Sequence, residues 1–241
     1  MNVLTISNSF GVDATRYLHQ IARQEGVELN DACLYISGCV LERHYRNMIS
    51  EERAYELFYN GSNTCFKVSM KEALLNRSWD IISIQQGSFH SAFPDKYDPY
   101  AESVAAYIRE CCPKAKLIVQ QTWAFQEGNE RLDRVGFPSQ AAMFAEIEKA
   151  YEKMVKTVDA EGLIPSGKLV QLLGENGIEK THRDGLHVTK GLGRYALGLL
   201  WYRMLTGRSV ANNAFRDFDE PVTEEEIAIA TRLVESFQPV F

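Results

Sequence analysis

Three side chains from distant parts of the chain have the chemical types needed to activate a serine. Ser9 follows the first apolar run, while Asp184 and His187 lie three residues apart near the C-terminus. A serine hydroxyl is a weak nucleophile at neutral pH, so a histidine must take its proton and a carboxylate must fix the histidine tautomer. A spacing of three on a loop can bring carboxylate and imidazole together directly. The pattern is typical of a serine hydrolase whose fold brings Ser9 to the Asp184 and His187 pair.

The same chemistry requires hydrogen-bond donors for the oxyanion that forms on the substrate. Ser9 precedes a helix that we expect to begin near Asp13, so its backbone N–H lies close to a helix start. Gly38 follows the second apolar run, and a glycine lets a substrate approach the backbone closely. The N–H groups of Ser9 and Gly38 are therefore the expected backbone donors.

Short apolar runs alternate with longer amphipathic stretches, a pattern that predicts strands and helices layered in an α/β fold. We expect strands at 2–7, 33–36, 79–85 and 116–120. We expect helices at 13–25, 69–76, 98–112, 138–161 and 168–173, and another of about seventeen residues that ends at Thr206. In open α/β sheets the ligand site lies at the carboxyl ends of the strands. Ser9, Gly38 and Gln85 each follow such an end.

The chain is expected to form one domain over residues 1–241, because one core suffices at this length. Two short strands joined through Gly61 predict a hairpin inserted at about 55–68. The acidic run after Thr223 predicts a packing helix at about 223–237. The stretch 199–202 is expected to be core.

The composition excludes several classes of protein. The 241 residues are 45% hydrophobic and 24% charged, which excludes a collagen-like, disulfide-stapled or disordered chain. The formal net charge of −6, without a basic block, argues against a nucleic-acid partner. No apolar stretch approaches 18 residues and no secretion signal precedes the first strand, so we expect no membrane segment. The five cysteines fit reduced thiols, which predicts a cytoplasmic protein.

Five motifs along residues 1 to 210 resemble those of the SGNH, or GDSL-like, hydrolases, and more closely their bacterial branch known as DUF4886. They are Ser7-Asn8-Ser9-Phe10, Tyr35-Ile36-Ser37-Gly38-Cys39-Val40-Leu41-Glu42, Gln85-Gln86-Gly87-Ser88, Gln121-Thr122-Trp123-Ala124 and Arg183-Asp184-Gly185-Leu186-His187. Each motif is weak by itself, but five in the same order are specific. The resemblance implies a three-layer α/β/α sandwich with a mainly parallel sheet, the flavodoxin-like SGNH-hydrolase fold. It also implies ester hydrolysis without a cofactor or metal.

The resemblance assigns a role to each member of the triad. Ser9 is the expected nucleophile, His187 the general base and then acid, and Asp184 the orienting carboxylate, while Gly38 supplies an oxyanion N–H.

Two positions depart from the family pattern. Ser7 stands where the family usually has glycine, and Phe89 stands where it has an asparagine that donates to the oxyanion. The amide of Gln86 can donate the same hydrogen bond, so Gln86 is the expected third donor. Gln85 points to the opposite face if the strand continues, so only one of the two glutamines should serve.

The expected substrate-binding residues flank these motifs; they are Phe10, Gln85, Ser88, His90 and Trp123. We expect a serine esterase that removes an acetyl or other short acyl group from a carbohydrate or small metabolite. The carbohydrate part rests on analogy with the family. The oligomeric state stays open.

Other functions stay open. A non-catalytic protein that binds a small molecule or carbohydrate on the same fold would fit the replacements at Ser7 and Phe89. A lipid esterase or thioesterase is less favoured, because no exposed apolar helix is evident. Metal-assisted hydrolysis would need His182, Asp184 and His187 as ligands, but their spacing is not that of a zinc site.

A glycine pattern near the C-terminus offers a further alternative. Gly191 and Gly193 resemble part of a dinucleotide-binding fingerprint, but the pattern opens no helix after a strand and has no preceding βα unit. We expect these glycines to let a helix pack closely beside the catalytic loop.

Overall fold

A seven-stranded sheet forms the centre of the computed structural model, which describes all residues from 1 to 241. The strands are β1 (Asn2–Ser7), β2 (Asn30–Tyr35), β3 (Tyr55–Tyr59), β4 (Ser62–Val68), β5 (Ile81–Ile84), β6 (Lys116–Gln120) and β7 (Gly162–Ile164). Their spatial order is β4-β3-β2-β1-β5-β6-β7. The pairs among β2, β1, β5, β6 and β7 are parallel, while β3 and β4 run antiparallel at one edge.

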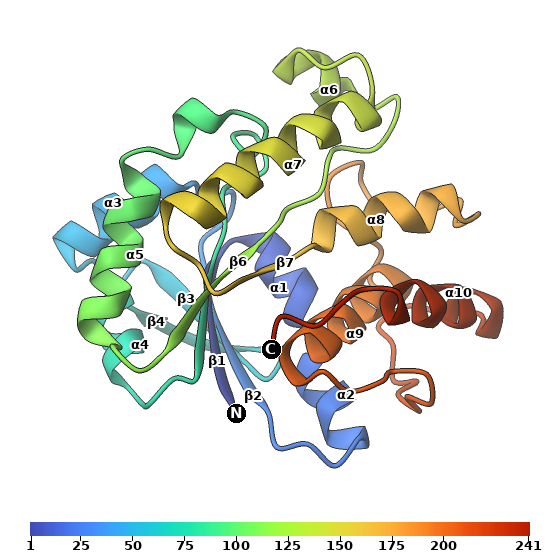
Figure 1. Cartoon of the computed structure of the whole chain (residues 1–241), viewed down its shortest axis with the longest axis horizontal. Coiled ribbons are helices and arrows are strands. Elements are labelled where there is room, and N and C mark those ends of the chain that lie inside the picture. Colours follow the sequence, from blue (N-terminus) through green and yellow to red (C-terminus); the bar gives the residue numbers. More distant parts are fainter.

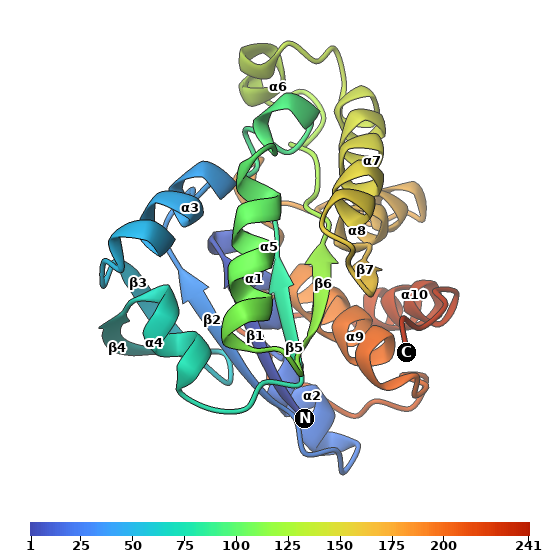
Figure 2. The same ribbon diagram turned by 60° about the vertical axis from the view of Figure 1, so that its left-hand side comes forward.

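Helices cover both faces of the sheet (Figure 1). One face packs against α1 (Ser9–Thr15), α2 (Leu18–Gln24), α8 (Ser166–Glu175), α9 (Leu192–Thr206) and α10 (Glu224–Glu235). The other packs against α3 (Leu41–Ser50), α4 (Met70–Leu75), α5 (Tyr100–Cys111) and α7 (Gln140–Thr157), as the turned view of Figure 2 also shows. The short helices η1 (Pro94–Lys96) and α6 (Glu130–Val135) lie in connecting segments. The predicted three-layer α/β/α fold with a mainly parallel sheet is confirmed.

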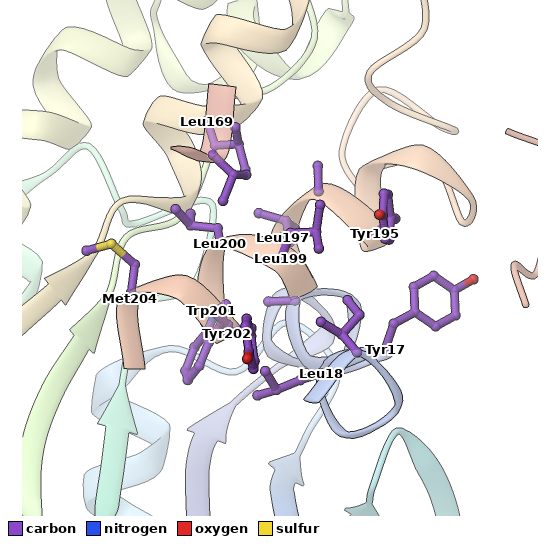
Figure 3. Close-up of a cluster of buried hydrophobic side chains, with 14 of the residues drawn as sticks. Tyr17, Leu18, Leu169, Tyr195, Leu197, Leu199, Leu200, Trp201, Tyr202 and Met204 are labelled. Atoms are coloured by element: carbon purple, nitrogen blue, oxygen red, sulfur yellow. The ribbon is translucent and has the colours of Figure 1, made fainter. Parts of the chain in front are cut away.

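Each layer has its own apolar core. Val3 and Ile81 face one set of helices, whereas their neighbours Leu4 and Ile82 face the other, as alternation along a strand requires. Both faces are buried, which explains why these strands read as continuous apolar runs. Figure 3 shows the first core, to which Leu200 and Trp201 of α9 and Leu18 of α2 belong. Residues 199 to 202 are fully buried, as predicted.

The predicted hairpin forms, with β3 paired to β4 and β3 also paired to β2. It extends the sheet rather than standing apart from it. The C-terminal helix starts as predicted: Thr223 and Glu226 form a capping box in which each side chain bonds the other's backbone N–H. No helix has the length and apolar character that crossing a membrane requires.

Several element predictions were wrong in detail. The helix expected at 13–25 begins at Ser9 and breaks after Thr15 into α1 and α2. Asp98 does not cap α5, because the helix begins at Tyr100 and Pro99 stands at the cap position; the Asp98 carboxylate accepts a hydrogen bond from Lys153. The predicted helix at 138–161 ends earlier, and the chain then enters strand β7. Helices α3 and α6 were not predicted.

A buried carboxyl at the start of β2 makes stability depend on pH. Asp31 is 1% exposed, neither carboxyl oxygen has a hydrogen-bond partner, and burial raises its pKa to about 7. An unfolded aspartate has a pKa of about 4, so the folded chain binds the extra proton between these values. The stability that this group contributes is therefore complete below about pH 4 and is lost as the pH rises through about 7.

We expect Asp31→Asn to be more stable than the wild type at pH 8, by on the order of 3 kcal/mol, because the amide never ionises. At pH 4 the difference should shrink toward zero. Urea unfolding at both pH values measures it, with the exposed Asp217→Asn as the matched control. A gain for Asp31→Asn that is the same at pH 4 and pH 8 would show that ionisation of Asp31 is not the cause.

Candidate active site

Ser9, Gly38 and Gln85 follow the carboxyl ends of β1, β2 and β5, while Asp184 and His187 lie on the loop between α8 and α9. The chain passes from β1 to β2 on one side and later places β5 on the other side of β1. Such a switch point leaves a crevice between the loops that diverge from neighbouring strands. Asn8 links two of these loops, because its side-chain amide donates to the backbone oxygen of Cys39 at 3.0 Å.

Ser9 is the first residue of helix α1. Asn8 caps this helix: its side-chain oxygen accepts a hydrogen bond from the N–H of Phe10 at 2.9 Å. The N–H of Ser9 lies in the first turn and has no partner within the helix. The serine hydroxyl thus leaves a rigid element directly after the central strand. Sequence reasoning missed the capping role of Asn8, although asparagine just before a helix is its usual signature.

Asp184 and His187 lie on a tight hairpin. Its base is an antiparallel bridge between His182 and Val188, and the N–H of Arg183 donates to the oxygen of His187 at 2.9 Å. Within the turn, Asp184 Oδ1 accepts hydrogen bonds from the N–H groups of Leu186 at 3.0 Å and His187 at 2.7 Å. The carboxylate therefore shapes the loop that carries the imidazole.

The three predicted triad residues meet in one chain of hydrogen bonds. His187 Nδ1 lies 2.7 Å from Asp184 Oδ2, and His187 Nε2 lies 2.9 Å from Ser9 Oγ. A carboxylate can only accept, so Nδ1 carries the proton and Nε2 is left to accept the serine proton. Both distances fit the requirement for a nucleophile and a base within direct hydrogen-bond reach.

Hydrogen bonds stabilise the ionised form of the Asp184 carboxyl, which is nearly half exposed. Partial burial acts to raise the pKa of this carboxyl, but the hydrogen bonds from the backbone N–H and imidazole of His187 and the N–H of Leu186 outweigh it. They hold the pKa well below its usual range. Because the folded pKa is depressed, the stabilising effect of this carboxylate is present above pH 4 and is lost only as the pH falls toward that lower value.

Gly38 has the geometry expected of an oxyanion donor. Its φ is +60°, in the left-handed region that favours glycine, and the residue is exposed. No hydrogen-bond partner occupies its backbone N–H. An ideal Cβ at Gly38 would meet nothing within 4 Å, so a side chain there would project into open space beside the site and crowd a substrate.

The prediction that Gln86 donates the third oxyanion hydrogen bond is wrong. Its side chain is 0% exposed, and its amide nitrogen donates to the oxygen of Lys96 at 2.9 Å. Its amide oxygen accepts from the N–H groups of Leu41 and Gly87. Gln86 therefore joins the segments of Leu41 and Lys96 to its own loop, and its buried amide has no hydrogen-bonding atom left for a substrate.

Gln85 is also buried, so its predicted contact with substrate is wrong. As expected, it points away from Gln86: its amide nitrogen donates to Asn8 Oδ1 at 3.0 Å. Gln85 thus supports the residue that caps α1. No glutamine amide in this motif faces the substrate side.

Phe10 and Trp123 lie beneath the triad and do not line a pocket, contrary to prediction. They are 1% and 0% exposed, and their rings stack at 3.8 Å with an interplanar angle of 4°. Trp123 Nε1 donates to the oxygen of Leu186 at 2.8 Å, and the Phe10 ring meets the His187 ring edge-on at 6.0 Å. The pair forms an apolar floor for the loop that carries His187.

The remaining residues expected to contact substrate, Ser88 and His90, differ in their exposure to solvent. Ser88 is 8% exposed and its backbone oxygen accepts from Ser91 Oγ, so it is unsuited to binding a substrate. His90 is half-buried, and burial lowers the pKa of its imidazole. Phe89, which stands at the position of the family's asparagine, is 42% exposed and packs against Phe125.

Ser7, the other departure from the family pattern, is accommodated by a nearby glycine. The Ser7 side chain is 1% exposed, and an ideal Cβ on Gly11 would lie 2.1 Å from Ser7 Oγ. The extra hydroxyl thus fills space that Gly11 leaves free and stays away from Ser9. A glycine at position 7 is not needed when position 11 is glycine.

The expected role of Gly193 is confirmed. A Cβ at this position would lie 2.6 Å from the Cβ of Val188, and the Gly193 N–H donates to Thr189 Oγ1 at 2.9 Å. Helix α9 therefore packs directly on the segment that follows His187.

The metal alternative finds no support in the ring contacts of His182. Its nitrogens contact Thr181 Oγ1 at 2.8 Å and the oxygen of Ala124 at 3.1 Å, and burial lowers its pKa to about 4. His187 likewise uses both nitrogens within the triad. Nowhere in the chain do three or more His, Cys, Asp or Glu side chains gather in an arrangement that could hold a metal ion.

Gly87 sets the position of the loop that carries Gly38. A Cβ at residue 87 would lie 2.7 Å from Val40 Cγ1 and 2.8 Å from the oxygen of Cys39. We expect Gly87→Ala to displace this loop and to lower kcat by up to about 10²- to 10³-fold, the cost of losing an oxyanion donor. The measurement is steady-state hydrolysis of a short-chain nitrophenyl ester.

Gly174→Ala provides the control for this substitution. A Cβ at Gly174 meets no atom closer than 4.0 Å, so kcat should stay unchanged. Equal kcat in Gly87→Ala and the wild type would show that the loop position does not matter for turnover.

The fold and the order of the motifs define the class of SGNH-type α/β/α proteins. A solved protein from Slackia heliotrinireducens, described as an SGNH hydrolase, is 20% identical with a TM-score of 0.63, over 84% of this chain and 97% of that one. A GDSL-like lipase from Parabacteroides merdae is 14% identical with a TM-score of 0.55, over 83% and 93%. At these identities the likeness shows the fold alone. No curated protein matches the sequence.

The chain belongs to the DUF4886 family, whose model, described as a domain of unknown function, matches residues 2–233. A solved DUF4886 family protein from Bacteroides uniformis is 29% identical with a TM-score of 0.89, over 97% of this chain and 93% of that one. The family resemblance predicted from the five motifs is therefore confirmed.

Proposed function

We propose that the protein is a serine esterase that works through an acyl-enzyme. The observation that carries the proposal is the unbroken series of hydrogen bonds from Ser9 Oγ through His187 to Asp184 Oδ2. The series lies at the switch point of the sheet, where α/β proteins bind ligands. Serine, imidazole and carboxylate in this order are the parts that acyl transfer requires.

Each step follows from these groups. Ser9 Oγ attacks the ester carbonyl carbon while His187 Nε2 takes the hydroxyl proton, and Asp184 stabilises the imidazolium. The tetrahedral intermediate then collapses, and His187 gives its proton to the departing alcohol. A water molecule repeats the sequence on the acyl-enzyme: His187 takes its proton, the carboxylic acid leaves, and the proton returns to Ser9.

Two backbone N–H groups, those of Ser9 and Gly38, stabilise the negative oxygen in both intermediates. Each additional preorganised donor is worth about 3 to 4 kcal/mol in such sites. A site with no side-chain amide donor should therefore be a slower esterase than one that has it.

We propose an acetyl or other short acyl group on a carbohydrate or small metabolite as the substrate. The buried Phe10 and Trp123 close the floor beneath Ser9, which leaves no apolar channel below the nucleophile for a long chain. The pocket of about 380 Å³ that Tyr59 and Trp79 line, between the β3–β4 hairpin and α4, lies at the amino ends of β2 and β5 and away from Ser9. The carbohydrate part rests on analogy with SGNH hydrolases.

A chain-length series tests this substrate class. We expect kcat/KM to be highest for nitrophenyl acetate or butyrate and to fall for the decanoate, and we expect release of acetate from acetylated xylose. Faster turnover of the decanoate would favour a lipid esterase or thioesterase and overturn the short-acyl proposal.

A non-catalytic binding protein is the second candidate, favoured by the missing side-chain oxyanion donor. The two candidates differ in the reactivity of Ser9, because only an activated serine reacts covalently with a fluorophosphonate. Binding of acetylated sugars without such a reaction would support this second function.

A further inference from the structure

We propose that the ion pair between Asp13 and Arg183 positions His187 against Ser9, an inference that rests on the proposed esterase function. Neither residue touches the reacting atoms. Both are positioning residues that fix the distance between the helix with the nucleophile and the hairpin with the base.

Asp13 lies one helical turn after Ser9. Residues four apart share a face of a helix, so Asp13 and Ser9 both face the hairpin. Asp13 is 1% exposed, and its two carboxylate oxygens have different partners: Oδ2 accepts from Arg183 Nη1 at 2.9 Å, and Oδ1 accepts from Arg194 Nε at 2.8 Å. A buried carboxylate with both oxygens paired in this way has little freedom to move.

Arg183 lies beside Asp184 on the hairpin. Its guanidinium also donates to the backbone oxygen of Val188, so the side chain is tied to its own hairpin as well as to Asp13. Two polar contacts therefore join helix α1 to the hairpin, Ser9 with His187 and Asp13 with Arg183, beside the ring contact of Phe10 with His187. The first contact is the catalytic hydrogen bond, and the second holds the two elements in register.

Arg194 links the ion pair of Asp13 and Arg183 to a second carboxylate, Asp219. Arg194, on α9, donates to Asp219 Oδ2 at 2.6 Å, and Arg16 donates to Asp219 Oδ1 at 2.7 Å. The hydrogen bond from Arg16 is the main cause that lowers the pKa of Asp219 to about 2, so this carboxylate stays charged. Arg194 is thereby held on both sides, and Asp13 cannot follow Arg183 if the hairpin shifts.

This second contact matters because Asp184 is itself nearly half exposed and cannot anchor the hairpin in the protein interior. A displacement of about 1 Å between nucleophile and base can cost on the order of 100-fold in rate. The ion pair is the charged link between the hairpin and the helix that carries Ser9.

The test compares Arg183→Gln with Arg203→Gln. Arg183→Gln leaves Asp13 paired with Arg194, which favours folding of the variant. Arg203 is as buried as Arg194 and lies on the same helix, but it pairs with Glu235, away from the hairpin. Each variant is assayed at 20 °C, after thermal melting has shown it to be folded, for kcat and KM of nitrophenyl acetate and for the rate of fluorophosphonate labelling at Ser9.

We expect Arg183→Gln to lower both kcat and the labelling rate by about 10- to 100-fold with KM within about twofold. Arg183→Lys should recover part of the loss, since an ammonium group can still pair with Asp13, and Arg203→Gln should label at the wild-type rate. A crystal structure of Arg183→Gln should show Ser9 Oγ and His187 Nε2 beyond hydrogen-bond distance.

Wild-type labelling rates in Arg183→Gln, or equal slowing in Arg183→Gln and Arg203→Gln, would overturn the positioning role and leave the esterase proposal intact. A wild-type protein that is not labelled at Ser9 would overturn the proposed function, and the positioning role with it.

Discussion

Ser9→Ala should lose at least roughly 10³-fold in kcat for nitrophenyl acetate. The substitution removes the only atom that can form the acyl-enzyme, while the oxyanion donors remain and give at most slow hydrolysis by water. Ser9 contributes no side-chain hydrogen bond other than the one to His187, so the variant should keep the stability of the wild type. Steady-state kinetics with a matched thermal melt measures both effects.

Ser103→Ala is the control. Ser103 lies on the solvent-facing side of α5, and its hydroxyl donates a hydrogen bond only to the backbone oxygen of Pro99. It should retain full activity. A folded Ser9→Ala protein that turns over nitrophenyl acetate as fast as Ser103→Ala would show that another group is the nucleophile.

Asp184→Asn should lower kcat by roughly 10²- to 10⁴-fold. The asparagine oxygen can replace Oδ1 and keep the hydrogen bonds to the N–H groups of the turn. The amide nitrogen would then face His187 Nδ1 and donate to it, so the proton of the imidazole would move to Nε2. A protonated Nε2 cannot accept the proton of Ser9.

Asp133→Asn, on the surface helix α6, serves as the control and should leave kcat unchanged. KM should change little in either variant, since Asp184 does not contact the substrate in the proposed mechanism. A loss of less than about fivefold in Asp184→Asn would contradict the assigned role, because a tautomer change of this kind costs far more.

The sequence was sufficient to predict that Ser9, His187 and Asp184 meet, because the proposed chemistry depends on residue types that the fold brings together in one order. The Asp184 and His187 spacing predicts their contact by itself, and the position of Ser9 after a buried strand predicts the end of the sheet where it lies. The same local reasoning predicted where α4 and α10 begin, and each start has a capping box between residues three apart.

Gln86 shows why the positions of the other site residues could not be predicted from the sequence. Its amide is a chemically reasonable oxyanion donor, but its partners are Leu41, 45 residues away, and Lys96, ten residues away, and no local pattern links either of them to it. Burial of Phe10 and Trp123 likewise depends on packing between helices and loops that no local pattern records. Helix α1 was misplaced because a seven-residue helix containing Gly11 has little propensity of its own; packing of Gly11 on Ser7 supports it.

The residues that sequence reasoning overlooked are those of the ion pair beneath the triad. Asp13 and Arg183 are 170 positions apart, and each is of a type that usually lies in solvent. Arg183 directly precedes Asp184 in its motif, but nothing in the local sequence indicates a function for Arg183. Burial of Asp13 is what distinguishes this contact from an ordinary surface ion pair.

Covalent labelling of Ser9 tests the central claim most directly. The wild-type protein is incubated with a fluorophosphonate probe, digested and examined by peptide mass spectrometry. We predict a single adduct on Ser9, no adduct in Ser9→Ala, and strongly slowed labelling in Asp184→Asn. An unlabelled wild-type protein, or labelling that is unchanged in Ser9→Ala, would contradict the account of this site as a serine esterase.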